Sequence, residues 1–525
     1  MSARISARYR SAFTLVEMLI AMALTMILVY AIAEFYVYVG STVRDGRALI
    51  DLNGQMRVAT TRLAADLEQR TLPMVEPWTD DGAAQGYFTI REGVGSDSDV
   101  NGNSILDLTE DGDSNGVPDF TQNNVTTLIG DTDDFLAFTI RSAAEPLVGQ
   151  AVGANLTQGT LLTDALGEPI TTPLTSSTAE VAWWTTFTDA NGDFNYNVGE
   201  PRFLQRRQMI IRPDLNQIYS GDSNYSGPYF VRVNGTNVAE LYYTLLQYSD
   251  VSVRPLGVIN GFTYFTANSL VDLTRRENRF MHIGGGANFP NPLDLNPNYY
   301  GDVSQNRSQS PVNNGSQWRW VLDGQRAGEE RMLSSLLAFD VRVFDPTAPT
   351  RANNADPDGT LTPGDLTDNA NGTVQPGDPG WPLAVTNSYP FIGLGAYVDL
   401  YYLRYATGTS TFSAQPRSVG TAAQQTAYAN LLGATYDTWA LSYERDGLNQ
   451  DFPADGVANI NTAPFDEGTD GLDNDGASGV DDPGERETSP PYPDPLRGIQ
   501  IRIRMYEPGT RQVRQATVAT DFMPE

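Results

Sequence analysis

The sequence predicts an α+β protein in which a long N-terminal α-helix packs on a head rich in β-sheet, with long loop insertions. Three features carry this prediction. Residues 13–39 form an almost unbroken apolar run, residues 40–72 continue it with a helical repeat, and the chain after Pro73 alternates short strand patterns with long polar stretches. One helix followed by a series of strands is typical of the α+β class.

The apolar run holds one acidic residue near its front, Glu17, and residues 18–33 carry no charge. About 20 apolar helical residues cross a bilayer, so the run is long enough to be a transmembrane segment. Three basic residues precede it: Arg4, Arg8 and Arg10. They predict a single pass through a membrane, with the N-terminus in the cytoplasm and the head on the other side. A carboxylate in a membrane costs roughly 2.5–3.5 kcal/mol on insertion scales, so we expect Glu17 to have a function.

The residues around Glu17 resemble the N-terminal motif of type IV pilins and type II secretion pseudopilins. The segment Ser11-Ala12-Phe13-Thr14-Leu15-Val16-Glu17 follows a basic leader and opens an apolar helix, as in those precursors. The resemblance implies that a prepilin peptidase removes residues 1–12 by cutting between Ala12 and Phe13, and that the new amine is methylated. It also implies that Glu17 pairs with the amine of a neighbouring subunit during assembly. The family usually has Gly where this chain has Ala12.

Two plainer interpretations of this segment are a signal anchor and a secretory signal peptide, since basic residues before an apolar stretch fit both. The apolar stretch continues past residue 33 to Val39 instead of ending at a cleavage site, which argues against the signal peptide. The pilin resemblance implies four partners: the prepilin peptidase, other pilin or pseudopilin subunits, the inner-membrane assembly platform and the lipid bilayer.

The second half of the helix, residues 40–72, is expected to be amphipathic and to lay its apolar face on the head. Three glycines weaken it, each by about 1 kcal/mol relative to Ala, and Leu72-Pro73 ends the pattern. A continuous helix would be roughly 85 Å long at 1.5 Å per residue. The recurring apolar residues are Val43, Ile50, Leu52, Met56, Leu63 and Leu67.

Composition limits what the head, residues 73–525, can be. The chain has 525 residues, no cysteine, one histidine and a formal charge of −30. The lack of cysteine excludes a disulfide scaffold. The acidic excess argues against a nucleic-acid partner, because phosphate binding needs basic residues. It keeps the protein soluble and attracts cations.

The head is expected to be one elaborated β-rich domain. Alternating or β-branched runs predict strands at 135–140, 180–185, 208–212, 337–344, 397–403 and 499–506. The last run places Ile499, Ile501, Ile503 and Met505 on one face, which predicts a half-buried antiparallel strand. Polar stretches rich in Asn, Asp, Gly and Pro are expected to be loops, near 92–134, 284–317, 345–392 and 446–495.

The order of these strands resembles the larger minor pseudopilins, the J-type tip subunits and their W-type pilin relatives. Segments 133–139 and 180–184 are similar to their first head strands, and segments 336–346 and 495–525 are similar to their closing strands. The resemblance implies a subunit at or near the tip of a short pilus, which helps to start assembly or contacts cargo.

Two acidic repeats in the first insertion predict calcium binding. Each repeat places oxygen-bearing side chains at positions 1, 3, 5 and 9 of a Gly-containing turn. Ca²⁺ takes 6–8 such oxygens at about 2.3–2.6 Å. The second repeat resembles those of thrombospondin type 3 modules; the alternative is a solvated acidic loop. The expected ligands are Asp99, Asn101, Asn103, Asp107, Asp111, Asp113, Asn115 and Asp119.

Two weaker acidic patterns leave calcium and plain acidic turns equally open. The first follows EF-hand spacing, but its Gly is at position 4 instead of 6. The second has Ala477 at its fifth position and is incomplete. The candidate ligands are Asp189, Asn191, Asp193, Asn195 and Glu200 in the first pattern, and Asp473, Asp475 and Asp481 in the second.

Enzymatic patterns are poor. Residues 112–116 match the Gly-x-Ser-x-Gly nucleophile elbow, but acidic turns flank them where a strand and a helix are needed. The single histidine, His282, stands beside a glycine run, and no His or Cys cluster could hold zinc.

These patterns predict a structural subunit and no enzymatic activity. We expect a minor (pseudo)pilin of a type II secretion or type IV pilus-like system, with a head stabilised by Ca²⁺. The alternative is a membrane-anchored adhesin or cargo-binding module that uses the prepilin leader only for export. Such a module would not need Glu17.

Overall fold

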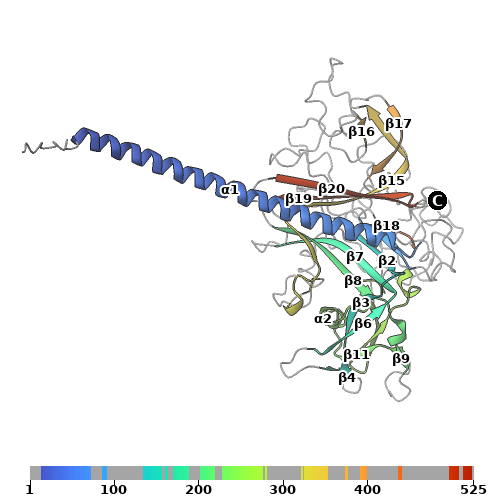
Figure 1. The fold of residues 1–525 in the computed structure, drawn as a ribbon. Coiled ribbons are helices and arrows are strands. Elements are labelled where there is room, and N and C mark those ends of the chain that lie inside the picture. The colour runs from blue at the N-terminus through green and yellow to red at the C-terminus, as the bar shows by residue number, and fades with distance from the viewer. Residues whose placement is uncertain are drawn as a thin grey trace, which may run out of the picture.

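The computed structural model describes residues 14–72, 86–91, 134–155, 160–162, 169–188, 201–218, 227–275, 278–280, 321–322, 324–352, 373–375, 391–398, 435–439, 496–507 and 512–522. One long helix projects from a head built of β-sheets (Figure 1), which confirms the predicted α+β class. The α-helices are α1 (Leu15–Glu68) and α2 (Val238–Tyr248), and short 3₁₀ turns lie at Pro213–Leu215, Asp272–Thr274 and Gly324–Arg326.

The first sheet has six antiparallel strands in the order β14-β8-β7-β2-β1-β18. Its central strands β2 and β7 are buried on both faces, and most of their buried residues are apolar. The predicted strands at 135–140 and 180–185 are confirmed, whereas the one predicted at 208–212 starts earlier and ends at Ile210, three residues before Pro213. The strands are β1 (Phe88–Arg91), β2 (Phe135–Arg141), β7 (Thr178–Phe187), β8 (Arg202–Ile210), β14 (Arg331–Ser334) and β18 (Thr435–Asp437).

The second sheet has the order β16-β15-β19-β20, and β17 pairs with the other edge of β15. Strand β19 alternates as predicted: its four apolar residues from Ile499 to Met505 are buried, and the polar residues between them are partly exposed. Of the strand predicted at 397–403, residues 399–403 lie outside the described residues. The strands are β15 (Leu336–Ala352), β16 (Thr373–Val374), β17 (Phe391–Val398), β19 (Gly498–Glu507) and β20 (Gln512–Asp521).

The prediction of a loop from residue 345 to residue 392 was wrong at both ends. Strand β15 continues to Ala352, and β17 begins at Phe391. Pro346 and Pro349 suggested a loop because proline cannot donate to a sheet, but the pairing of β15 with β17 shifts register between Asp345 and Pro349. The Asp345 carboxylate accepts the Thr347 N–H at 2.7 Å, which satisfies the backbone within this irregular stretch.

The remaining strands form smaller antiparallel sheets beside α2. Buried hydrophobic residues from α1, both main sheets and α2 belong to one continuous core, so the described parts of the head share a single interior. The small sheets are β11-β13-β12 (Val231–Asn234, Phe262–Ala267, Val253–Ile259), β3-β6 (Leu147–Val152, Thr171–Ser176), β9-β10 (Gln217–Ile218, Pro228–Tyr229) and β4-β5 (Ala154–Asn155, Thr160–Leu161).

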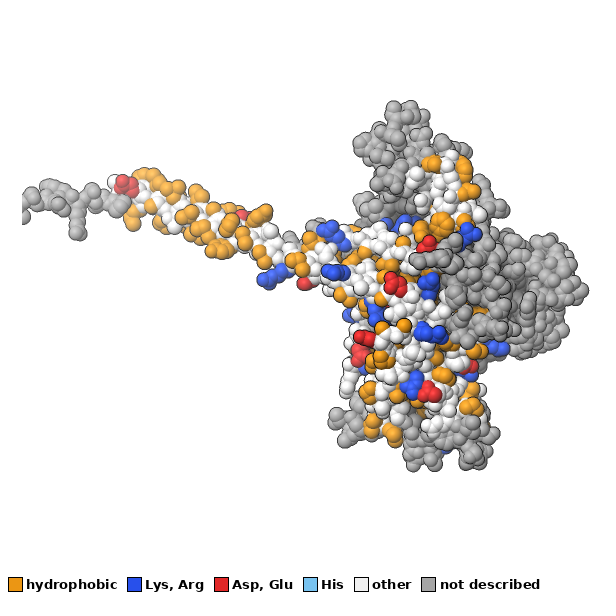
Figure 2. All heavy atoms as spheres, turned by 45° about the vertical axis from the view of Figure 1, so that its right-hand side comes forward, with side chains coloured by type: hydrophobic (Ala, Val, Ile, Leu, Met, Phe, Trp, Pro, Cys, Tyr) orange, Lys and Arg blue, Asp and Glu red, His pale blue; other side chains and the backbone are white. Residues whose placement is uncertain are grey.

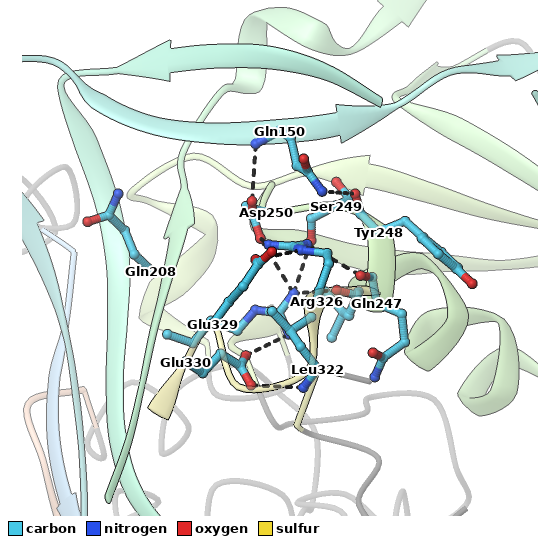
Figure 3. Close-up of polar contacts among 12 residues, drawn as sticks. Gln150, Gln208, Gln247, Tyr248, Ser249, Asp250, Leu322, Arg326, Glu329 and Glu330 are labelled. Atoms are coloured by element: carbon cyan, nitrogen blue, oxygen red, sulfur yellow. Dashed lines mark hydrogen bonds and ion pairs between the residues drawn. The ribbon is translucent and has the colours of Figure 1, made fainter. Parts of the chain in front are cut away.

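An ionic cluster joins the end of α2 to the first sheet (Figure 3). Arg326 donates to the Asp250 carboxylate at 2.8 Å, and the Gln150 N–H donates to the same carboxylate at 3.2 Å. The Glu330 carboxylate lies 3.0 Å from the Arg207 guanidinium of β8. Burial raises the pKa of Glu330, and the neighbouring Arg207 opposes this shift. The cluster therefore fixes the chain that leads into β14.

The second half of α1 lies against both main sheets. It contacts β14 of the first sheet and β19 and β20 of the second. Its buried stripe has helical spacing and comprises Leu52, Met56, Ala59, Leu63 and Leu67. The prediction of an apolar face against the head is confirmed from Leu52 onward. Val43 and Ile50, which were predicted to continue that face, are exposed, because they point away from this stripe.

Helix α1 ends at Glu68, four residues before the predicted end at Leu72. The chain changes there from helical to sheet hydrogen bonding. The Arg141 N–H donates to the Gln69 carbonyl at 2.7 Å, and the Thr71 N–H donates to the Thr139 carbonyl at 2.9 Å. The end of the helix is therefore tied directly to β2.

A buried carboxylate on α1, Asp66, fixes the helix to the first sheet. The Arg206 guanidinium of β8 donates two hydrogen bonds to it, at 2.7 and 2.9 Å, and the Trp183 indole N–H of β7 donates a third at 3.1 Å. Arg62, one turn earlier on α1, lies 3.2 Å from the same carboxylate. Asp66 is 1% exposed, and its charge is balanced by these donors.

We expect Asp66→Ala to lower the free energy of unfolding by about 3 kcal/mol or more, because it leaves the Arg206 charge partly buried without its partner. Chemical unfolding of the full-length protein in detergent, followed by tryptophan fluorescence, measures this loss. Asp51→Ala is the matched control, since Asp51 is an exposed carboxylate on the same helix, and its effect should stay within about 0.5 kcal/mol. Equal effects of the two substitutions would contradict the role of Asp66.

Candidate functional site: the exposed half of the N-terminal helix

The first half of α1 extends away from the head with its apolar side chains uncovered. All described side chains from Leu15 to Arg47 are exposed. Figure 2 shows hydrophobic side chains over the projecting part of the helix. Its most apolar 18-residue window has a mean hydropathy of 2.4, and none of that window is buried within the protein. Within the described ranges, α1 is the one helix long and apolar enough to cross a membrane. So large an uncovered apolar surface marks contact with lipid or with other proteins.

Glu17 lies in the first turn of this helix and forms a capping box with Thr14. The Thr14 side-chain oxygen accepts the Glu17 N–H at 3.3 Å. Glu17 Oε2 accepts the Thr14 N–H at 2.9 Å and the Thr14 hydroxyl at 3.0 Å. This arrangement satisfies two amide groups that a helix N-terminus otherwise leaves unpaired. Glu17 Oε1 accepts no hydrogen bond from any described residue, so one carboxylate oxygen is available to a second molecule.

The sequence pattern Thr-x-x-Glu at residues 14–17 signals a capping box, and the interpretation of Glu17 as an assembly residue overlooked it. The two roles are compatible, because the box uses only one carboxylate oxygen. Both residues follow the predicted cleavage site, so cleavage would leave the box intact. Ala12 and Phe13 themselves lie outside the described residues.

The predicted calcium ligands also lie outside the described residues, but the strands before and after each pattern are described, and for two of the three patterns both strands belong to the first sheet. Residues 92–133 connect β1 to β2, and residues 189–200 connect β7 to β8. The antiparallel pairings Arg91↔Phe135, Leu136↔Trp183 and Phe187↔Arg202 show that both connections leave the same end of the first sheet. The predicted site at 99–119 and the weaker one at 189–200 are therefore attached to neighbouring strands.

The described part of the chain has no group of three or more His, Cys, Asp or Glu side chains that could hold a metal ion. The elbow pattern at 112–116 and His282 lie outside it.

Glu180, the single carboxylate of β7, is buried, and its contacts are those of a structural residue. It accepts the Tyr87 hydroxyl at 2.5 Å, the Ser252 hydroxyl at 2.9 Å and the Phe280 N–H at 2.9 Å. Burial raises the pKa of Glu180, and these hydrogen bonds oppose the shift. A raised pKa in the folded state means that the folded protein binds the proton more tightly, so the contribution of Glu180 to stability falls as pH rises above about 4.3.

A second buried pair, Arg279 and Asp437, ties the edge of the first sheet to residues 278–280. The Arg279 guanidinium lies 4.0 Å from the centre of the Tyr87 ring and forms an ion pair with the Asp437 carboxylate. Both charged side chains are fully buried. No sequence pattern predicts this pair, because the two residues are far apart in the chain and neither belongs to a motif.

Comparison with protein families supports the assignment of the site to α1. Residues 7–32 match the family described as the prokaryotic N-terminal methylation motif. The match includes the predicted cleavage site, Glu17 and the front of α1. No curated protein and no solved structure is significantly similar to the chain.

The chain joins a projecting helix, long and apolar enough to cross a membrane, to a β-rich head, and the methylation motif supports a place among the type IV pilin-like proteins. The same motif implies processing by a prepilin peptidase and assembly with other pilins. The motif family is structural rather than enzymatic.

We expect protein extracted from membranes to begin at a methylated Phe13. The 34 Lys and Arg residues are all arginine, so the α-amine is the only primary amine in the chain. Methylation converts it to a secondary amine, and intact-mass spectrometry should show the loss of residues 1–12 and the gain of one methyl group. Ala12→Gly should be processed at least as completely, because glycine is the usual residue of the family. An intact Met1 or Ser2 terminus in a host with active peptidase would contradict the predicted cleavage.

Proposed function

We propose that this protein is a structural minor (pseudo)pilin of a type II secretion or type IV pilus-like system. It is held in the inner membrane by the front half of α1, with its N-terminus in the cytoplasm and its head in the periplasm or outside the cell. From there it enters a filament, near the tip. The observation that carries the proposal is the methylation motif at residues 7–32, which leads directly into an uncovered apolar helix with a carboxylate in its first turn.

The charges of the exposed helix support pairing between Glu17 and an N-terminal amine. Residues 13–43 contain no Arg, Lys or His. After cleavage, the amine of Phe13 would be the one cation that a pilin helix of this kind brings into the membrane. An unpaired carboxylate in a medium of low dielectric costs several kcal/mol, and an amine within about 4 Å offsets that cost. Glu17 Oε1 accepts no hydrogen bond from the described residues, so it is available for such an amine.

The structure of the head supports the proposal that this protein is a specialised subunit. It contains two main sheets and several smaller ones, and it carries long acidic insertions. A β-rich head of this size suits a subunit present in few copies, as expected for a position near the tip. The adhesin or cargo-binding alternative uses the same anchor but makes Glu17 dispensable.

We expect Glu17→Gln to insert into the membrane as well as the native protein, because it removes a charge that is costly in lipid. Incorporation into filaments should fall at least tenfold, because the partner amine then lacks its counter-charge. Co-purification with sister pilins and recovery in sheared filament fractions measure the loss. Asp51→Asn, on the same helix beyond the apolar run, is the matched control and should assemble normally. Normal assembly of the Glu17→Gln variant would favour the adhesin or cargo-binding alternative.

We also propose that the head binds Ca²⁺ through the repeats at 99–119. No basic residue stands between these repeats, so their carboxylates repel one another without a cation. The attachment of the 92–133 and 189–200 connections to one end of the first sheet supports a cation-binding region there.

We expect the full-length protein in detergent to melt at a higher temperature in millimolar calcium than in chelator. At affinities of about 10⁻⁴–10⁻³ M, the stabilisation is on the order of 1 kcal/mol per site. Asp111→Ala combined with Asp113→Ala should remove most of the difference. Asp80→Ala combined with Asp81→Ala is the control, since this adjacent acidic pair lies outside the repeats. Identical melting of metal-stripped protein with calcium and with chelator would contradict calcium binding.

A further inference from the structure

The second sheet ends in a long and regular edge strand, β20. This strand pairs with β19 along all ten of its residues, without a shift of register. It contains no proline and no glycine. Natural proteins protect the edges of their sheets with short strands, bulges and prolines, because an open edge can pair with another chain. Strand β20 has none of these three protections.

The other outer edges of the two main sheets are protected. The first sheet ends on one side in β18, which has three residues, and on the other in β14, which has four residues and an irregular register between Arg331 and Leu333. On the far side of the second sheet, β16 has two residues and the pairing of β17 shifts register twice. Among the described strands of these sheets, β20 therefore forms the long regular edge.

The register shows which backbone groups of β20 point outward. The Phe522 N–H donates to the Arg497 carbonyl at 2.9 Å, so the backbone of residue 522 faces the β19 side. In an antiparallel pair, residues that face the neighbouring strand alternate with residues that face away. The even-numbered residues of β20 therefore face β19, and the odd-numbered residues present their N–H and C=O groups on the other side.

We define the outer edge of β20 by four of these odd-numbered residues. Their side chains are exposed, and no described strand pairs with their outward backbone groups. The edge is about 20 Å long at roughly 3.4 Å per residue. It can hold a partner strand of about seven residues through main-chain hydrogen bonds, which is the recognition mode called strand addition. The four residues are Val513, Gln515, Thr517 and Ala519.

One end of the outer edge carries an arginine on each face of the sheet. Arg504 Nε donates to the Gln515 side chain at 2.7 Å, so this guanidinium lies over β20 on the face of Gln515. Arg514 is exposed, and it lies on the opposite face because it pairs with Met505, which is buried in the core. Consecutive residues of a strand point to opposite faces. Two consecutive carboxylates of a partner strand can therefore meet both arginines.

A second copy of β20 does not fit this edge. The strand contains a single carboxylate, Asp521, so it cannot supply two consecutive acidic residues. Antiparallel pairing of two copies also needs a two-fold axis perpendicular to the sheet. Helix α1 lies lengthwise along β20 (Figure 1), so this axis would direct the two helices in opposite directions. The partner is therefore a different polypeptide.

We propose that the outer edge of β20 docks an extended segment of another protein, which adds a strand to the second sheet and places two consecutive carboxylates against Arg504 and Arg514. The proposal goes beyond the proposed function, because it concerns the head alone. It applies equally to a filament subunit and to a cargo-binding module.

Peptide binding to the full-length protein in detergent tests strand addition. The probe is a fluorescent peptide of eleven residues, alternating threonine and valine, with two adjacent glutamates at its centre, so that either strand direction covers the edge. Thr517→Pro should weaken its binding at least tenfold in fluorescence anisotropy, because proline removes the outward N–H. The pairing with β19 does not use this N–H, so the variant should fold. Thr517→Ala keeps the N–H and should bind as the native protein does.

A charge reversal tests the chemistry of the partner. The native protein should bind the glutamate peptide at least tenfold more tightly than the same peptide with two glutamines. Arg514→Glu should remove this preference, because like charges on neighbouring strands repel, and it should leave the affinity for the glutamine peptide unchanged. Arg47→Glu is the matched control, since Arg47 is an exposed arginine on the part of α1 outside the head. It should change neither affinity.

Four outcomes would overturn the proposal. They are no binding of the glutamate peptide to the native protein, equal binding to the Thr517→Pro and Thr517→Ala variants, equal affinity of the native protein for the two peptides, and self-association of the native protein that Thr517→Pro abolishes. The last outcome would make the occupant a second copy. None of these measurements involves Glu17, so each leaves the proposed function unchanged.

Discussion

The carboxylate of Asp66 is the contact that sets how α1 is placed on the head. The apolar stripe from Leu52 to Leu67 supplies most of the buried area, but apolar packing has little directionality and would tolerate a small slide or rotation of the helix. The Arg206 guanidinium donates two hydrogen bonds of fixed geometry to the Asp66 carboxylate. The Trp183 indole adds a third bond from the next strand. The position and rotation of α1 are therefore fixed at the place where it meets the centre of the first sheet.

The sequence predicted most of what depends on periodicity. The apolar run, the stripe at Leu52, Met56, Leu63 and Leu67, and the alternation of β19 are local patterns whose period determines which face is buried. The prediction ended strand β15 too early. The sequence shows the prolines at 346 and 349, but it does not show the partner strand with which the chain pairs around them. Val43 and Ile50 were assigned to the buried face on apolar character alone, but their positions in the helical repeat place them on the side of α1 opposite the stripe.

The polar core could not be predicted from the sequence. In the sequence, Asp66 is only an acidic residue beside the apolar stripe of α1. Its partners come from strands more than a hundred residues away. Glu180 and the Arg279–Asp437 pair likewise depend on contacts between distant segments. The candidate site could be predicted from the sequence, because the expected role of Glu17 follows from its position relative to the leader and the start of the helix. This motif is local, and the match at residues 7–32 supports it.

The passage from β14 to β15 has a mechanical consequence. The chain moves from the edge of the first sheet into the second through Ser335 alone, at a positive φ of 59°, and the Tyr506 N–H of β19 donates to the Ser335 carbonyl at 2.9 Å. Helix α1 contacts β14 on one side of this corner and β19 on the other. A pull along α1 would load both sheets together and would shear many packed side chains at once instead of peeling one strand from an edge. The head should then resist traction on its anchor as a single block.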